Sequence, residues 1–351
     1  MERTPLSPSA RLNGHNGAVL CAKYAENSIL GPDILASGSE DQTCRLWDLR
    51  QMRAIKGIQK LNDAVSSVAF GQNAELYLAV GTKVYTYDLR NDGMIISEPV
   101  QEYAFSQDEI NSIDIHSNGK YLATADDQGE VKVIDLERHK PYKKLVKKHD
   151  NICMAVRFRA KKPWEVWSGG LDCRLFQWDF SRGVPVNGYD TNANEASSAQ
   201  MFNPPFVYSI DTSPTGNWVA AGLGDCSIQV LGEVGGSKKK KKQTCHARLM
   251  DAHTNLVNCL CFLPQGQEDG SSFEQLLSGS ANGILARWEL NEEQIQASDM
   301  LAAKSTYQLD NSVARLNWIE SCGTEGNAYR IAAAGVGNQT NQGTLNIYSI
   351  I

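Results

Sequence analysis

Histidine, serine and aspartate follow one another in a fixed order near the start of this chain, as His15, Ser37 and Asp41. These are the residue types of a nucleophilic triad, in which an imidazole oriented by a carboxylate removes a proton from a serine hydroxyl. The same order recurs with His149, Ser168 and Asp172. A hydrolase needs one such set, so the repetition argues against catalysis. We therefore expect no catalytic residue and no enzyme activity.

The repeated sets share a spacing that ends in tryptophan. Each serine is followed four residues later by Asp or Asn, and six residues after that by Trp. An indole N–H, a hydroxyl, an imidazole and a carboxylate can hydrogen-bond in series, which satisfies buried polar groups. We interpret three sets as structural networks: His15, Ser37, Asp41 and Trp47; His149, Ser168, Asp172 and Trp178; His253, Ser278, Asn282 and Trp288.

This order of His, Ser, Asp and Trp resembles the WD40 repeat family, whose repeats form the four-stranded blades of a propeller. Weaker copies between the three clear ones bring the number of units to seven. The third strands are expected to end at Trp47, Tyr87, Ile134, Trp178, Leu231, Trp288 and Tyr348. Short apolar runs bounded by Gly, Asn and Asp are typical of the other strands. The predicted fold is an all-β, seven-bladed WD40 propeller.

Ring closure is also predicted from the sequence. The chain ends in a strand-like segment, Thr344–Ile351, and Ala10–Leu12 can supply the missing outer strand of that last blade. Such pairing removes an open sheet edge. We predict a disordered N-terminus at 1–9 and a single propeller over 10–351, with insertions near 183–205, 233–245 and 291–305. A short helix is expected in the last insertion.

Composition limits which cofactors and cellular locations we expect for the protein. Nine cysteines without a C-x-x-C pair indicate neither a zinc site nor a disulfide framework. Residues 1–12 are polar, and no apolar run approaches the length of a membrane span. We expect a soluble, monomeric, intracellular protein, cytoplasmic and/or nuclear, without a cofactor or metal and without membrane contact.

One charge run, Lys238–Lys242, interrupts an acidic chain of net charge −6. It is either a solvated loop or a nuclear-import or nucleic-acid contact. The rest of the chain is more acidic still, which argues against broad nucleic-acid binding.

A short motif points to a protein partner. Trp47, Asp48 and Arg50 lie in a segment that resembles the W-D-x-R box of many cullin-4 ubiquitin ligase substrate receptors, and Tyr87, Asp88 and Arg90 form a relaxed copy. The resemblance implies binding to the ligase adaptor, the damage-specific DNA-binding protein. A guanidinium suits that task because it makes several directed hydrogen bonds at once. The same arginines equally suit salt bridges at the ends of their strands.

Further segments are similar to the WD repeat-containing protein fifty-three family. They are Asp108–Asn111, Leu122–Asp127, Lys148–Cys153, Gly170–Asp172, Gln200–Pro204 and Leu316–Trp318. The resemblance implies a seven-bladed substrate receptor of a cullin-4 ligase with no defined substrate. The competing interpretation is a chromatin or RNA-processing scaffold that binds a peptide.

Acidic residues precede several expected inner strands, where propeller loops surround the central channel. They are Asp63, Asp108, Glu109, Asp150, Asp251 and Asp310. Gathered on one face, they would give it a negative potential suited to a basic peptide. Alternatively they only cap turns, as Asp often does.

Overall fold

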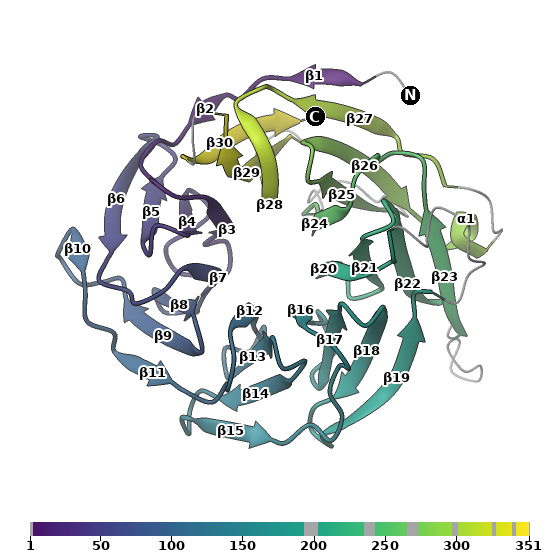
Figure 1. Cartoon of the computed structure of the whole chain (residues 1–351), viewed down its shortest axis with the longest axis horizontal. Coiled ribbons are helices and arrows are strands. Elements are labelled where there is room, and N and C mark those ends of the chain that lie inside the picture. The colour runs from purple at the N-terminus through teal and green to yellow at the C-terminus, as the bar shows by residue number, and fades with distance from the viewer. Residues whose placement is uncertain are drawn as a thin grey trace.

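The computed structural model describes residues 3–192, 203–234, 243–264, 273–296, 301–324, 328–338 and 342–350. Seven sheets, antiparallel except for the added fifth strands of two of them, form a ring of blades around a central channel, as Figure 1 shows. The predicted seven-bladed propeller is therefore confirmed. All seven residues expected near the ends of third strands lie on the third strands of their blades.

Each blade is a sheet of four strands, counted from the channel outward, and blades 1 and 6 each gain a fifth. The strands of blades 1 to 3 are β3 (Val19–Tyr24), β4 (Ile34–Ser39), β5 (Cys44–Asp48), β6 (Arg53–Ile58) and β10 (Ile95–Ile96); β7 (Val65–Phe70), β8 (Glu75–Val80), β9 (Lys83–Asp88) and β11 (Gln101–Tyr103); β12 (Ile110–Ile115), β13 (Tyr121–Asp126), β14 (Val131–Asp135) and β15 (Lys140–Lys143).

The remaining blades follow the same order. The strands of blades 4 to 7 are β16 (Cys153–Phe158), β17 (Glu165–Gly170), β18 (Arg174–Asp179) and β19 (Val184–Asp190); β20 (Val207–Thr212), β21 (Trp218–Leu223), β22 (Ile228–Val234) and β23 (Gln243–Leu249); β24 (Val257–Phe262), β25 (Glu274–Ser280), β26 (Ile284–Leu290), β27 (Ser305–Leu309) and β1 (Thr4–Leu6); β28 (Val313–Gly323), β29 (Tyr329–Gly337), β30 (Gly343–Ile350) and β2 (Ala10–Arg11).

The N-terminal strand β2 closes the ring, as predicted. It pairs with β30, so that Ala10 lies opposite Ile347, and Figure 1 shows the two strands side by side. The amide of Leu12 donates a hydrogen bond to the carbonyl of Leu345 at 2.8 Å. Leu12 is buried with Leu35 and Ile347 between blades 7 and 1. The ends of the chain therefore share one apolar core.

The expectation of a disordered N-terminus at 1–9 is wrong for part of that segment. β1 pairs in parallel with β27, so that Thr4 lies opposite Tyr307. The backbone groups at the outer edge of blade 6 find partners there, which favours order.

Two of the expected insertions contain blade strands. The insertion near 183–205 includes β19, which pairs with β18 as the outer strand of blade 4; residues 193–202 lie outside the described residues. The insertion near 233–245 is the connection between β22 and β23, and Lys238–Lys242 lies outside the described part of the chain. In the third, the expected short helix is α1 (Glu292–Gln296).

Buried apolar side chains gather between neighbouring blades. One cluster, for example, joins Leu46 and Ile58 of blade 1 to Leu76 and Leu78 of blade 2. Every inner strand also has a register shift near its first residue. Such irregularities increase local twist, which suits strands that line a narrow channel.

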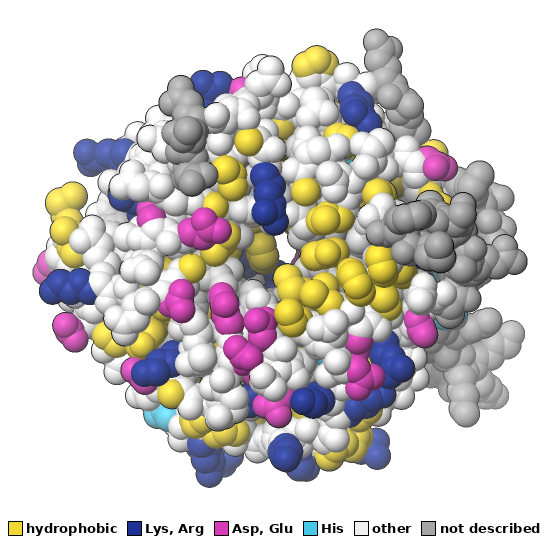
Figure 2. All heavy atoms as spheres, in the orientation of Figure 1, with side chains coloured by type: hydrophobic (Ala, Val, Ile, Leu, Met, Phe, Trp, Pro, Cys, Tyr) yellow, Lys and Arg dark blue, Asp and Glu magenta, His cyan; other side chains and the backbone are white. Residues whose placement is uncertain are grey.

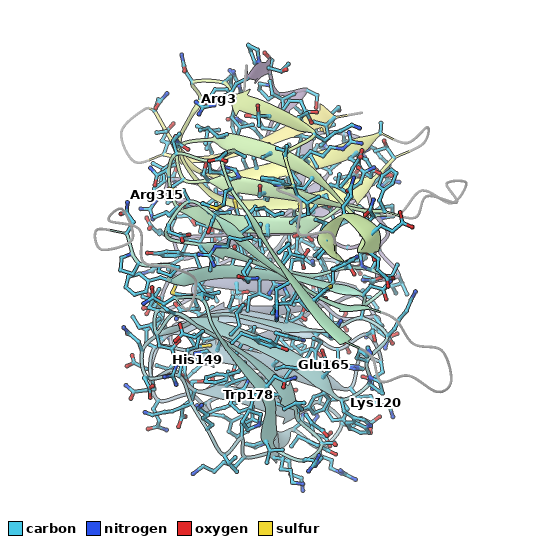
Figure 3. All side chains as sticks on the ribbon, turned by 90° about the vertical axis from the view of Figure 1, so that its right-hand side faces the viewer. Arg3, Lys120, His149, Glu165, Trp178 and Arg315 are labelled. Carbon is cyan, nitrogen blue, oxygen red and sulfur yellow. The ribbon has the colours of Figure 1, made fainter. Side chains whose placement is uncertain are left out.

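The connections between strands lie on two opposite faces. We call upper the face with the connections between blades and the turns between second and third strands, and lower the other. In Figure 3, His149 on a connection between blades lies on one side, whereas Glu165 and Lys120 beside the starts of second strands lie on the other. Figure 2 views the upper face.

Candidate functional site

The first two His–Ser–Asp–Trp sets form the buried networks that their spacing predicts. Trp47 Nε1 donates to Ser37 Oγ at 2.8 Å, His15 Nε2 lies 2.8 Å from the same oxygen, and His15 Nδ1 lies 3.0 Å from Asp41. His149, Ser168, Asp172 and Trp178 repeat this arrangement with distances of 2.8 to 3.1 Å. Each serine hydroxyl is engaged by indole and imidazole within a packed blade. These hydrogen bonds connect the loops that contain His and Asp to the buried Ser and Trp of the same blade.

The third set differs in one link. Trp288 Nε1 donates to Ser278 Oγ at 2.9 Å, and His253 Nε2 lies 2.7 Å from that hydroxyl. The expected contact between His253 and Asn282 is replaced by Ser280, whose oxygen lies 3.1 Å from His253 Nδ1 and 2.7 Å from Asn282. No carboxylate faces this imidazole in the network, and burial lowers the pKa of His253 to about 4.

On the lower face, Arg50 and Arg90 occupy equivalent places in blades 1 and 2. Each follows the third strand by two residues and donates side-chain hydrogen bonds from Nε and Nη2 to an aspartate of that strand, Arg50 to Asp48 and Arg90 to Asp88. These bonds lower the pKa of both aspartates to about 2. Both arginine side chains remain 67% exposed. The expected salt bridges are thus present, and the guanidinium groups are fixed yet accessible.

Three residues of the motif are buried. Trp47, Asp48 and Tyr87 are 2%, 4% and 1% exposed. The two aromatic rings pack in the core, and Arg50 engages the Asp48 carboxylate. The expectation that these three side chains belong to a binding surface is therefore wrong, because the rings are enclosed by the blades and the carboxylate is covered by its arginine.

A third arginine on this face was missed by sequence reasoning. Arg138 Nη1 lies 3.2 Å from Asp135 Oδ2 in the corresponding turn of blade 3 and is 66% exposed. The signal was Asp135 at the end of the expected third strand, with arginine three residues later instead of two. In blade 4, Ser181 takes the place of the arginine and donates to Asp179 at 2.6 Å.

On the upper face, three predicted acidic residues lie together with a fourth. Burial, followed by the charges of Asp127, Asp63 and Asp108, raises the pKa of Glu109. The four residues come from connections that enter blades 2 and 3 and from the turn after β13. We call Asp63, Asp108, Glu109 and Asp127 the acidic group. Figure 2 shows acidic side chains gathered beside the channel there.

The other predicted acidic residues do not join this group. Asp310 lies 2.8 Å from Arg11 and accepts hydrogen bonds from Ser312 and Tyr348, so its charge is compensated inside blade 7. Asp150 lies 3.5 Å from Arg174, and exposed Asp251 belongs to the connection between blades 5 and 6. The predicted ring of carboxylates is therefore confined to one side of the channel.

Apolar side chains occupy the opposite side of the channel mouth. Figure 2 shows a hydrophobic area over blades 4 to 6. Partly exposed apolar residues on the upper connections of these blades are Ile152, Leu171, Phe206 and Leu256. The upper face thus pairs an acidic half with an apolar half, and spacing alone did not reveal the apolar half.

The channel wall contains charged side chains of the inner strands, and three of them, Lys23, Arg157 and Asp211, are the fifth residue of their strand. Lys23 Nζ lies 2.5 Å from Glu320, and Arg157 Nε lies 3.9 Å from Asp211. Burial raises the pKa of Asp211 to about 6. The two residues of each pair come from neighbouring blades, so the pairs link adjacent inner strands along the channel wall.

No metal-binding arrangement of three or more His, Cys, Asp or Glu side chains occurs within the described residues. All nine cysteines are free thiols. In the part of the chain that the structure describes, no helix is long and apolar enough to cross a membrane.

Comparisons with known proteins agree with the fold. The family model for the WD domain, G-beta repeat, matches residues 6–48, 97–135, 200–230 and 243–289. The chain is similar to the WD repeat-containing protein 53 homolog of Dictyostelium discoideum, with 29% identity over 81% of this chain and 78% of that one. It is also 26% identical to the protein groucho of Drosophila melanogaster, over 62% of this chain and 27% of groucho.

A solved structure resembles the whole ring. The β-propeller domain of Cps50 (Swd1) from Myceliophteria thermophila superposes with a TM-score of 0.71 over 97% of this chain and 99% of that one, at 17% identity. That likeness concerns the fold alone. With four segments that match the WD repeat model and with seven blades, the chain has the WD40 propeller fold, which is generally a non-catalytic scaffold for protein interaction.

Proposed function

We propose that this protein is a substrate receptor of a cullin-4 ubiquitin ligase and that its lower face binds the ligase adaptor. The observation that supports this most is the pair of exposed guanidinium groups, Arg50 and Arg90, each held by the aspartate of its own strand. A side chain fixed before binding loses less conformational entropy when a partner arrives. Arg138 continues this arginine row on blade 3.

The test is co-purification of the adaptor with the Arg50→Ala, Arg90→Ala double variant. An interface arginine contributes on the order of 2 kcal/mol when it is well packed against a partner. We therefore expect a large loss of adaptor at an unchanged melting temperature, because both side chains are exposed. Arg315→Ala removes an exposed arginine that lies on the upper side of the ring, with His149, in Figure 3, and it should leave co-purification unchanged. If the double variant retains the adaptor fully, the proposal is wrong and both arginines serve only in salt bridges at the ends of their strands.

The upper face supports a second candidate function, a chromatin or RNA-processing scaffold that binds a basic peptide. The supporting observation is the acidic group beside an apolar area at the channel mouth. A lysine or arginine of the peptide would face Glu109 and Asp108, and its apolar residues would face blades 4 to 6. The two candidates use opposite faces and can be tested separately.

A further inference from the structure

A lysine-lined pocket lies on the outer side of blade 3, between the connections that enter and leave this blade. Its volume is about 520 Å³. One wall is the connection that follows β11 and contains Phe105; the floor is the start of β14, and the other wall is the segment 143–148. Five lysines line it against a single carboxylate, that of Glu130. We call this the lysine groove.

The groove retains positive charge after its internal pairs are counted. Lys132 lies 2.5 Å from Glu130 and 2.9 Å from Asp126, so these three side chains largely compensate one another. The hydrogen bond from Lys132 lowers the pKa of Glu130, and the charges of Lys148 and Lys144 act in the same direction. The charges of Lys144 and Lys148 therefore give the groove a positive potential.

The backbone holds the lysine wall in place. The amide of Val146 donates to the carbonyl of Gly183 in blade 4 at 3.0 Å, and Lys143 Nζ donates to the carbonyl of Ser181 at 2.9 Å. Leu145 is buried in the core of blades 3 and 4. Val146, by contrast, is 70% exposed. The wall is thus fixed against blade 4 and presents both charged and apolar side chains.

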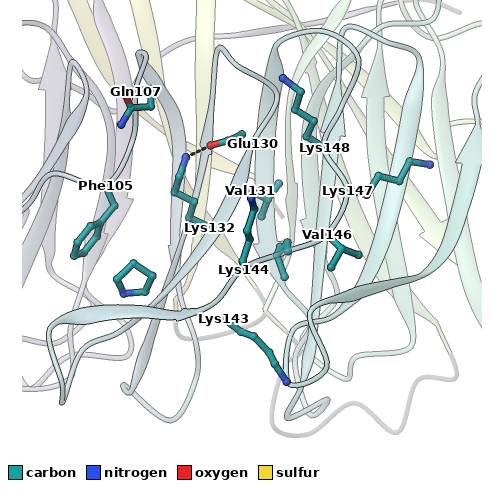
Figure 4. A pocket seen from close by; sticks show the side chains of 12 residues that line it. Phe105, Gln107, Glu130, Val131, Lys132, Lys143, Lys144, Val146, Lys147 and Lys148 are labelled. Atoms are coloured by element: carbon teal, nitrogen blue, oxygen red, sulfur yellow. Dashed lines mark hydrogen bonds and ion pairs between the residues drawn. The ribbon is translucent and has the colours of Figure 1, made fainter.

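Figure 4 shows the lysines spread along the groove rather than converging on one point. Lys148, Lys144 and Lys143 follow one another across the view, and Lys147 points to the side, where its ammonium lies 4.3 Å from the ring centroid of Phe176. A compact anion such as phosphate would need converging donors. An extended ligand with several separated negative charges fits this spacing better.

We propose that the lysine groove binds an extended, Asp/Glu-rich peptide segment of a partner protein. The carboxylates face Lys144 and Lys148, and apolar parts of the peptide rest against Val146 on one wall or the ring of Phe105 on the other. A peptide is favoured over single-stranded nucleic acid because Phe105 is the single aromatic residue among those that line the groove, so successive bases would find no row of rings to stack on. Lysine suits carboxylates of varied geometry because its ammonium is a point charge with rotatable donors.

The experiment measures binding of a fluorescent twelve-residue peptide of Glu and Asp with one central Leu, by anisotropy, to the full chain. The Lys144→Glu, Lys148→Glu variant reverses two exposed charges. We expect an affinity about tenfold weaker, since each exposed ion pair is worth a fraction of a kcal/mol and reversal adds repulsion. The affinity of the unaltered protein should also fall with added salt.

Lys60→Glu, Lys161→Glu serves as the matched control, because it makes the same change of charge at exposed lysines outside the groove. This control should bind like the unaltered protein, and circular dichroism should confirm that both variants are folded. Equal binding by the groove variant and the control would overturn the proposal. A second result would also overturn it. If a single-stranded RNA of equal charge binds more tightly than the peptide, and the groove variant abolishes this RNA binding, the groove is a nucleic-acid site.

Discussion

At the scale of single residues, the blade networks show how one substitution changes the chemistry of a repeated site. In blades 1 and 4 the imidazole faces a carboxylate, Asp41 or Asp172. In blade 6 it faces the hydroxyl of Ser280 instead, and His253 is buried without a compensating charge. Burial disfavours the charged form of histidine, so this ring is neutral in the folded protein.

This difference predicts a dependence of stability on pH. The pKa of His253 falls from its ordinary value of 6.5 to about 4 on folding. As pH falls from 6.5 toward 4, the unfolded state takes up a proton that the folded state refuses, so the free energy of unfolding decreases. The integrated loss is on the order of 2–3 kcal/mol. Chemical denaturation at several pH values between 4.5 and 7.5 measures it.

The comparison with His253→Gln isolates this contribution. Glutamine can bond the Ser278 hydroxyl but does not titrate, so the variant should be less stable at pH 7.5 and should depend less on pH above pH 4.5. Asp41 contributes at a lower pH. Burial raises the pKa of its carboxyl, but hydrogen bonds from His15 and Thr43 outweigh burial and lower it, so the stability that this carboxylate contributes is lost only when the pH falls below the measured range. If variant and parent have identical pH profiles, His253 is already able to accept a proton in the fold.

At the scale of elements, closure depends on one short strand. β2 gives blade 7 its outer edge, and Leu12, 3% exposed, fills the core between blades 7 and 1. Deleting residues 1–13 removes this strand and should cause aggregation or lower the melting temperature by roughly 10 °C. Deleting residues 1–7 removes β1 alone and should have a much smaller effect. Scanning calorimetry and light scattering distinguish the two; a monomeric 1–13 deletion with unchanged melting contradicts the closure model.

The repeat made most elements predictable from sequence, because each blade requires the same residues at the same places. Trp47, Trp178 and Trp288 must be buried, and their spacing alone located the third strands. β1 was not predictable, since Thr4–Leu6 has no repeated pattern and owes its order to backbone pairing with β27. β19 was missed because an exposed outer strand needs no apolar alternation.

The candidate site was predictable only in part, because a surface depends on which residues the ring brings together. Arg50 and Arg90 were found through a local motif. The compensation of Asp310 by Arg11 was not, since the two residues meet only when the ring closes. The lysine groove likewise combines Phe105 with a lysine segment about forty residues later in the chain.

At the scale of the whole molecule, the ring separates its surfaces by charge. The lower face of blades 1 to 3 presents arginines, the upper face of blades 2 and 3 presents carboxylates, and the outer side of blade 3 presents lysines. The arginines of the lower face lie on the opposite side of the ring from the acidic group, so one partner on each of these two faces can bind at the same time without competing. A scaffold that joins proteins requires this separation.

The upper face predicts selective binding of a Lys/Arg-rich peptide. Asp108→Asn with Glu109→Gln removes two charges from the acidic group and should weaken that binding about tenfold, while Asp92→Asn with Glu98→Gln removes two exposed charges elsewhere and should not. Because burial and neighbouring carboxylates raise the pKa of Glu109, lowering the pH should protonate it early and weaken binding, as added salt should. Titration calorimetry with basic, neutral and acidic peptides decides the matter: if all three bind equally poorly, these carboxylates only cap their turns.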